Sequence, residues 1–566
     1  PKWENINATV GSQYFWIDRI FAWEADPRNY MYQLVHTQRP GTLDTSLVST
    51  DYINNPRTMN AIYHLGPRLG LAKRWGAETL AGGELDNKQF NDFVDSGPLT
   101  ELFTPPATSY SPRVLKDGAD SVGALGALNR VYLNIGLYSE EWTRHFNPIV
   151  GGKPITPIEI KVAQEKSSYW QATEAQTPLT ALYFLKAGQP DRLVDAPGGT
   201  AHVSQDTALL ERGKTVFAER CARCHSSKIP EPAPGLDRGG CAGPNYLQCW
   251  NRYWAWTKTD EFKAKMRQIV LAPDFLEDNY LSTDFRVPVP LLQTNACSPL
   301  ATNAIGGNIW DNFSSQTYKS LPSVGTVTVH HPITGEPSQY VMPADGRGYT
   351  RVPSLISLWS TAPYLLNNTV GTFNPDPSVE ARVAAFQDGI EQMLWPEKRA
   401  KDPVLGDKVP GIIDRTTARS YLTIPTGFQP ELLVKILAPF RDSLRTVNER
   451  GDIEIGPIPA GVPVMLISNL DLRPDRMGLV DRVKHNAKLG RLVIRAIRDL
   501  RAMPEDASDE VAKRTFANLV EPMLELSKCR DFVVNRGHYF GTEKFAEEPG
   551  LSDGEKRDLI EFLKTL

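Results

Sequence analysis

The residues with the clearest chemical potential stand together in the sequence Arg220-Cys221-Ala222-Arg223-Cys224-His225. Two residues separate the cysteines, and a histidine follows the second cysteine directly. Thiolates and imidazoles bind zinc, a C-x-x-C pair is typical of thiol redox chemistry, and C-x-x-C-H is the attachment signature of c-type haem. The residues around the motif decide between these three kinds of site.

A structural zinc site needs a second pair of ligands at short spacing, and the chain contains neither another C-x-x-C nor an H-x-x-x-H. A thioredoxin-type pair lies between a strand and a helix, whereas the preceding residues, TALLERGKTVFAER, predict an amphipathic helix. We therefore predict covalent haem c. Cys221 and Cys224 each bind one vinyl group, and His225 is the proximal ligand of the iron.

Two helices must position this motif. Gly213 and Phe217 are similar to the glycine and aromatic residue on the first helix of cytochromes c, where a small residue lets another helix cross closely. The last residues, LSDGEKRDLIEFLKTL, predict a second helix with a capping box of Ser552 and Glu555. Its apolar face consists of Leu559, Ile560, Leu563 and Leu566. We expect this helix to pack across the one before the motif, in a cytochrome c-like domain over 206–566.

Composition limits the class of protein. The chain has 566 residues, a net charge of −4 and no run of Lys or Arg, which argues against nucleic acid as a partner. No apolar run approaches the roughly 18 residues that cross a bilayer. The chain begins PKWENINATV, and covalent haem is attached outside the cytoplasm, so we expect a periplasmic or secreted protein whose export signal has been removed.

The remaining cysteines are expected to form disulfides in such an oxidising compartment. Cys241 and Cys249 enclose the short segment AGPNYLQ, which contains a Gly-Pro turn. We therefore expect a disulfide between them, which leaves Cys297 and Cys529 as the remaining pair.

The pattern along the chain predicts a mainly α fold with many loops, because 44 Pro and 42 Gly are spread throughout and no strand–helix alternation appears. Residues 1–205 are expected to form an N-terminal, helical and loop-rich domain. Within 206–566 we expect two insertions. A β-hairpin at about 325–342 turns at Thr334-Gly335-Glu336, and a helical insertion at about 400–530 contains GLVDRVKHNAKLGRLVIRAIRDLRAM and DEVAKRTFANLVEPMLELSKC.

Three further segments resemble one family of haem proteins. YTRVPSLISLWSTAPYLLNNTVGTF (349–373) is similar to a segment of bacterial dihaem cytochrome c peroxidases and, more closely, of the related rubber oxygenases. RVYLNIGLYSEEWTRHFNPIVGGK and NRGHYFGT are similar to the rubber oxygenase branch. The resemblance covers about half of the chain and implies two haems c in two cytochrome c-like domains, with C-x-x-C-H matching the C-terminal haem.

The resemblance also implies roles for particular residues. It makes His538, in NRGHYF, the expected distal ligand of the haem iron, and it makes the backbone near Thr361 and Pro363 a candidate calcium site. The chain departs from the family in two ways. It has no second C-x-x-C-H, and the histidine that follows APY in the family is replaced in the sequence APYLLN.

Other candidate ligands remain open. Met342 would give His/Met ligation and a higher reduction potential. His330 and His331 are adjacent in a predicted strand, so they point to opposite faces and cannot chelate one metal together. His202 lies before the helix that leads to the motif.

A second, non-covalent haem could be held by a histidine of the N-terminal half, although the default interpretation of these histidines is structural. They are His36, His64 and His145. Glu140-Glu141-Trp142 beside His145 is the one group that resembles acid–base machinery, and a solvated i,i+4 pair of Glu141 with His145 is its ordinary interpretation.

Two functions therefore stay open at this point. The first is a haem oxidoreductase that acts on peroxide, oxygen or an organic substrate. The second is a bis-histidine electron carrier that delivers electrons to a redox partner protein.

Overall fold

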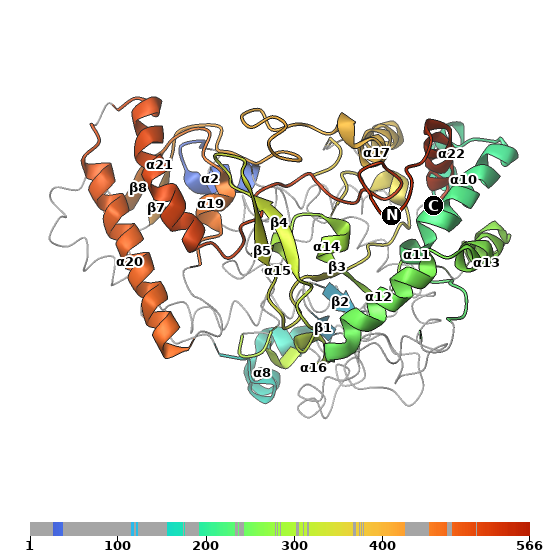
Figure 1. The fold of residues 1–566 in the computed structure, drawn as a ribbon, viewed down its shortest axis with the longest axis horizontal. Coiled ribbons are helices and arrows are strands. Elements are labelled where there is room, and N and C mark those ends of the chain that lie inside the picture. The colour runs from blue at the N-terminus through green and yellow to red at the C-terminus, as the bar shows by residue number, and fades with distance from the viewer. Residues whose placement is uncertain are drawn as a thin grey trace.

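The computed structural model describes about three fifths of the chain, from residue 26 to the C-terminus with gaps. The described residues are 26–37, 115–117, 120–122, 156–173, 175, 192–232, 236, 243–277, 279, 281–283, 285–300, 305–308, 311–313, 316–365, 369–372, 374, 376, 378–424, 452–471, 478–504 and 507–566. Helices dominate this part of the chain and strands are few and short (Figure 1). The prediction of a mainly α fold is confirmed at this level.

Most of the described secondary structure is α-helical. The α-helices are α2 (Tyr30–Thr37), α8 (Ile160–Lys166), α10 (Thr207–Arg220), α11 (Ala222–His225), α12 (Tyr246–Thr257), α13 (Asp260–Leu271), α14 (Val289–Leu292), α15 (Cys297–Leu300), α16 (Gln316–Lys319), α17 (Val379–Leu394), α19 (Val464–Ser468), α20 (Leu479–Arg501), α21 (Asp509–Glu525) and α22 (Asp553–Leu563). Short 3-10 turns join them at η3 (Leu193–Asp195), η4 (Gly199–His202), η6 (Gly243–Asn245), η7 (Asp311–Phe313), η8 (Leu358–Ser360) and η9 (Pro396–Lys398).

The described strands form four antiparallel pairs and no larger sheet. The pairs are β1 (Leu115–Asp117) with β2 (Asp120–Val122), β3 (Arg286–Pro288) with β6 (Tyr349–Arg351), β4 (Thr326–His330) with β5 (Pro337–Val341), and β7 (Ser420–Ile424) with β8 (Ile453–Ile458). The β4–β5 pair runs in register from Thr326↔Val341 to His330↔Pro337, which confirms the predicted hairpin and its turn.

Local sequence signals account for the ends of the helices next to the C-x-x-C-H motif. The carboxylate of Asp206 accepts hydrogen bonds from the N–H groups of Ala208 and Leu209 at 3.0 and 3.1 Å, so it caps α10. At α22, Ser552 and Glu555 form the predicted capping box.

Helices α10 and α22 cross at Gly213, as the sequence predicts. A Cβ atom at this position would lie 2.2 Å from the carbonyl oxygen of Asp558 and 2.8 Å from the Cβ of Phe562. Phe217, one turn further along α10, packs edge-to-face on Phe562 with ring centres 5.2 Å apart. The C-terminal helix is therefore packed directly against the helix that leads into the motif (Figure 1).

The insertion at about 400–530 contains the two predicted long helices, α20 and α21, which lie beside each other at one end of the molecule (Figure 1). It also contains the β7–β8 pair, which the helical prediction does not include. The sequence of β8, IEIGPI, holds both glycine and proline, and such residues weaken a strand signal.

Buried apolar side chains gather in three clusters. The first core cluster joins α10, α13, α17, η8 and α22, and includes Phe217, Phe262, Met266, Trp359, Phe386, Leu559 and Phe562. The second core cluster joins α2, the hairpin, α19, α20 and α21, and includes Tyr30, Val329, Met342, Leu466, Leu492, Phe516 and Val533. The third core cluster is mostly aromatic and includes Tyr246, Trp250, Tyr253, Trp254, Phe285, Tyr539 and Phe545.

Segments distant in sequence meet in these clusters. The hydroxyl of Tyr30 in α2 donates to the carbonyl oxygen of Val464 at 2.9 Å, so α2 packs on the insertion. Leu193 belongs to the first core cluster, although it precedes the predicted boundary at residue 206. A separate N-terminal domain over 1–205 stays a prediction. No described helix combines the length and the apolar character that a bilayer crossing needs.

Candidate functional site

The C-x-x-C-H motif forms one tight turn at the end of α10. The N–H of Cys221 donates to the carbonyl of Phe217 at 2.9 Å, which ends α10, and the N–H groups of Cys224 and His225 donate to the carbonyl of Cys221 at 3.1 and 2.9 Å. The two sulfurs and the imidazole therefore project from a single turn. Further along the chain, the N–H of Ser227 donates to the side-chain oxygen of Asn279 at 3.0 Å.

Cys221 and Cys224 are free thiols, each partly buried. Burial raises the pKa of Cys221 to about 12 and that of Cys224 to about 11, although the nearby Arg223 acts in the opposite direction. Redox-active C-x-x-C pairs and metal thiolates depend on lowered thiol pKa values. The raised pKa values of these two thiols therefore argue against a redox-active pair and against a metal thiolate.

The structure brings the imidazole rings of His538 and His225 close together. The centres of their rings lie 6.2 Å apart and the ring planes are inclined by 54°. Imidazole nitrogens bind transition metals at about 2 Å, and the ring centre lies about 1 Å behind the bonded nitrogen, so two imidazoles on opposite sides of one metal ion have centres about 6 Å apart. The observed spacing therefore fits an iron atom between the two rings.

The segment before His538 is held by buried hydrogen bonds. The N–H of His538 donates to the carbonyl of Leu292 at 2.7 Å. Arg399, which is almost fully buried, donates to the carbonyl oxygens of Asn535 at 3.2 Å and Gly537 at 2.9 Å. The backbone that carries His538 is thus held by contacts from α14 and from Arg399, directly after η9.

The backbone at His538 has an unusual conformation. Gly537 and His538 both have positive φ angles, of +102° and +53°. A Cβ at Gly537 would lie 2.6 Å from the backbone of Thr294, so glycine is required at this position. A positive φ is uncommon for histidine, and residues held in such conformations concentrate at functional sites.

The Cys297–Cys529 disulfide ties this segment to α15. Its sulfurs are 2.01 Å apart, which confirms the predicted pair. The side chain of Asn295 adds hydrogen bonds to the carbonyls of Asp531 at 2.7 Å and Val533 at 3.0 Å. Cys249 is also disulfide-bonded, and its predicted partner, Cys241, lies outside the described residues.

Apolar side chains line the space around the motif. Cys221 packs against the first core cluster and Cys224 against the third, so the two sulfurs lie at the boundary between these clusters. Next to His538, Phe540 packs edge-to-face on the imidazole with ring centres 5.1 Å apart, and it also packs on Phe545 at 4.7 Å. A flat apolar group with a metal at its centre is the kind of ligand that these surroundings fit.

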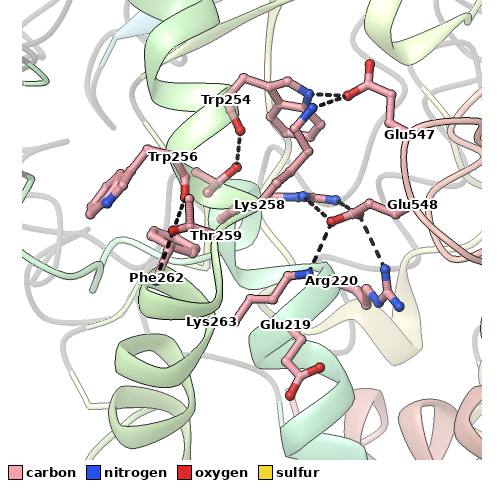
Figure 2. A network of polar contacts seen from close by, with 12 residues as sticks. Glu219, Arg220, Trp254, Trp256, Lys258, Thr259, Phe262, Lys263, Glu547 and Glu548 are labelled. Carbon is pink, nitrogen blue, oxygen red and sulfur yellow. Dashed lines mark hydrogen bonds and ion pairs between the residues drawn. The ribbon is translucent and has the colours of Figure 1, made fainter.

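A charged network lies beside the same turn. Arg223, between the two cysteines, donates to Glu548 Oε1 at 3.0 Å, and its guanidinium lies 4.3 Å from the centre of the Trp254 ring. Glu547 accepts hydrogen bonds from the indole N–H of Trp254 and from Lys258, both at 2.8 Å (Figure 2). These carboxylates come from the loop that follows His538.

The other predicted ligands have different surroundings. Met342 is fully buried within the second core cluster, where its methyl group lies near Gly348. His331 is the first residue after β4 rather than part of it; its ring nitrogens bond Glu521 at 3.0 Å and the backbone N–H groups of the hairpin turn. His330 ends β4, and burial lowers its pKa. His202 ends η4.

Thr361 and Pro363 follow η8 and stand on either side of Ala362, which belongs to the first core cluster. Thr361 is fully buried and its hydroxyl donates to the carbonyl of Leu358 at 3.0 Å. The carbonyl of Ala362, between the two residues, accepts from the buried guanidinium of Arg382 at 3.4 Å. Within the described residues, no group of three or more His, Cys, Asp and Glu side chains could hold a metal ion. Calcium here stays a prediction.

Several predictions fall outside the described part of the chain. His64, His145 and the Glu140-Glu141-Trp142 group belong to residues whose structure is not described, and only the backbone of His36 is described, in α2.

Sequence reasoning missed three residues that shape this site: Arg223, Arg399 and Glu548. Arg223 lies inside the motif, so its position gave a signal, but its partner Glu548 is 325 residues away. No local pattern links these residues, because their contacts exist only after the chain has folded.

Comparisons with known proteins give no relative for this chain. No family model, curated protein or solved structure matches it significantly.

Proposed function

We propose that this protein is a c-type haem protein with a cytochrome c-like haem domain, and that it transfers electrons. The observation that carries the proposal is the pair of imidazoles, His225 and His538, with ring centres 6.2 Å apart beside two free cysteines on the same turn. Cys221 and Cys224 would hold the haem through thioethers, and the two histidines would hold both axial positions of the iron.

When bound, the haem supplies a one-electron iron couple, and its axial ligands set the reduction potential. The chain's residues determine what else can happen there. If both His225 and His538 bound the iron, a substrate would have no free position on it. Phe540 packs on His538, and aromatic side chains beside a bound haem would limit the access of water to it, which would also affect its reduction potential. These features favour electron transfer over chemistry at this iron.

Two observations support an oxidising compartment such as the periplasm. Cys297–Cys529 and Cys249 are disulfide-bonded. Disulfides form and persist outside the reducing cytosol. The partner under this proposal is a redox protein that receives or supplies single electrons.

The first test counts and characterises the haem. A pyridine haemochrome assay on the purified protein should give one covalent haem per chain, and the ferric protein should show only low-spin optical and EPR signals. In the Cys221→Ser/Cys224→Ser variant the mass should equal that of the bare polypeptide. A wild-type protein that becomes colourless after acid-acetone extraction would disprove covalent attachment.

The second test addresses the distal ligand. His538→Ala should convert the ferric spectrum from low-spin to high-spin, because one axial ligand is lost. His331→Ala is the matched control, since His331 bonds Glu521 and the hairpin turn and should leave the spectrum unchanged. A low-spin spectrum that persists in His538→Ala would mean that another residue binds the iron.

The second candidate function is that of an enzyme. A chain of 566 residues is much larger than electron transfer alone requires. Helices α20 and α21, which pack in the second core cluster, lie at the opposite end of the molecule from the motif, and none of the contacts described around the motif involves them (Figure 1). In this alternative the haem feeds electrons to a second centre that acts on peroxide, oxygen or an organic substrate. More than one haem or metal per chain, by haemochrome and elemental analysis, would favour it.

A further inference from the structure

A buried ion pair joins the C-x-x-C-H turn to the loop that follows His538. The guanidinium of Arg223 donates to both carboxylate oxygens of Glu548, at 3.0 and 2.5 Å. The side chains are only 2% and 6% exposed. Bidentate arginine–carboxylate pairs combine strength with a defined geometry, so this pair fixes both the distance and the orientation of the two segments.

Two further cations, on α10 and α13, lie close to the carboxylate of Glu548. Arg220 at the end of α10 and Lys263 on α13 lie 3.6 and 3.8 Å from its oxygens (Figure 2). Burial would raise the pKa of Glu548, but the hydrogen bond from Arg223 and the nearby cations lower it below its ordinary value. Glu548 therefore stays ionised, and its carboxylate interacts with the motif turn, with α10 and with α13.

A chain of aromatic contacts extends from the same arginine to the distal imidazole. Arg223 stacks on Trp254 at 4.3 Å, Trp254 contacts Phe540 at 6.0 Å, and Phe540 packs on His538 at 5.1 Å. Phe540 and Glu548 belong to the same loop. The loop is thus attached to the motif by two kinds of contact. One is the ion pair of Glu548 with Arg223, and the other is the chain of aromatic contacts from Arg223 through Trp254 to Phe540.

We propose that the Arg223–Glu548 pair positions the distal ligand, holding the loop so that His538 remains on the iron. The proposal rests on the function proposed above. Neither residue is a ligand, and both act through the position of His538. When the pair is broken, the loop can move away from the turn, and His538 dissociates more often.

The test measures how readily an external ligand displaces His538. Carbon monoxide is mixed with the ferrous holoprotein by stopped flow, and its binding rate is limited by dissociation of the histidine. Glu548→Gln should raise this rate at least about tenfold, because removing one partner leaves the charge of Arg223 buried and uncompensated. Glu219→Gln is the matched control. Glu219 pairs with Arg267 in the same region, both side chains are partly exposed, and the rate should stay unchanged.

A second variant separates positioning from charge alone. Arg223→Gln removes a positive charge where Glu548→Gln removes a negative one, so an effect of charge on the iron would shift the reduction potential in opposite directions. Both variants break the same pair, and both should accelerate carbon monoxide binding. Where Arg223→Gln does not fold, Arg223→Lys keeps the charge without the bidentate geometry and should give a smaller acceleration.

The outcomes distinguish this inference from the proposed function. If His538→Ala remains low-spin, the proposed distal ligand is wrong, whatever Glu548→Gln does. If His538→Ala becomes high-spin while folded Glu548→Gln binds carbon monoxide at the wild-type rate, only the positioning role is overturned.

Discussion

Gly213 shows how a single residue sets the approach of two helices. Its missing side chain allows α22 to cross α10, and a methyl group there would overlap the carbonyl of Asp558, which is backbone and cannot rotate away. We expect Gly213→Ala to destabilise the protein by about 2 kcal/mol or more, because overpacking forces helices apart. Urea unfolding followed by circular dichroism measures this change.

Gly490 provides the control for that substitution. It also lies inside a helix, α20, but a Cβ there would meet nothing within 4 Å. Gly490→Ala should stabilise the protein by about 0.5–1 kcal/mol through the lower entropy of the unfolded chain. Equal effects of the two substitutions would show that the crossing at Gly213 is not a tight contact.

At the scale of single residues, the sequence predicted site residues only where the residue type and its spacing indicate a specific chemistry. The C-x-x-C-H spacing singled out Cys221, Cys224 and His225 directly, while His538 required a resemblance to be singled out at all. The structure brings His225 and His538 together. Arg399 and Glu548 had no such signal, because arginine and glutamate are ordinary surface residues until burial makes the partners of each important, here backbone carbonyls for Arg399 and Arg223 for Glu548.

At the scale of elements, the sequence predicted those helices and strands whose formation depends on residues close together along the chain. The capping box of α22, the long helices α20 and α21, and the β4–β5 hairpin depend on residues near each other in sequence. The β7–β8 pair joins strands whose ends, Ile424 and Ile453, are separated by a long connection. The sequence of a short strand does not indicate which distant strand it will pair with. Such a pair is determined by tertiary packing and not by a local pattern.

Asp402 organises the segment after η9 from a fully buried position. Its carboxylate accepts hydrogen bonds from the N–H groups of Leu405 and Ile413 at 2.8 and 2.9 Å, and from Arg415 at 2.6 Å. Burial would raise the pKa of Asp402, but these donors lower it below the ordinary value of 3.8. The carboxylate is therefore charged in the folded protein at neutral pH.

The stability that Asp402 contributes should depend on pH in a defined direction. Since its pKa is lower in the folded than in the unfolded chain, the contribution is complete well above pH 3.8 and is lost as the pH falls through the folded value. We expect Asp402→Asn to cost about 3 kcal/mol at pH 7, because the charge of Arg415 is left buried. The difference from wild type should shrink in acid.

Urea unfolding at several pH values between 7 and 3 measures this difference. Asp407→Asn is the control, since Asp407 pairs with Lys401 on the surface and is 83% exposed. Its removal should change stability by less than about 0.5 kcal/mol at every pH. A constant gap between wild type and Asp402→Asn across this range would contradict the assignment.

At the scale of the whole molecule, the buried apolar side chains of the described residues form three separate core clusters. The first and third core clusters lie beside the C-x-x-C-H turn, whereas the second extends from α14, α15 and the hairpin in the middle of the molecule to α20 and α21 at the other end (Figure 1). The segment between Cys529 and His538 links the two ends, because Val533 belongs to the second cluster and His538 faces the motif. The sequence predicted the haem domain and the helical insertion but not this division, which depends on which faces of distant segments meet.

This division predicts how loss of haem should affect the protein. In Cys221→Ser/Cys224→Ser the apolar group expected between the first and third clusters is not attached, and a ligand that binds only the folded state contributes directly to its stability. Amide hydrogen exchange read by mass spectrometry should then accelerate at least about tenfold in α10, α13 and α22, and in the loop that carries His538. The amides of α20 and α21 serve as the internal control and should exchange at wild-type rates, because their side chains pack in the second cluster, which includes Leu492 and Phe516. Equal acceleration at both ends would mean that the clusters unfold as one unit, and unchanged exchange everywhere would mean that haem is not part of the packed interior.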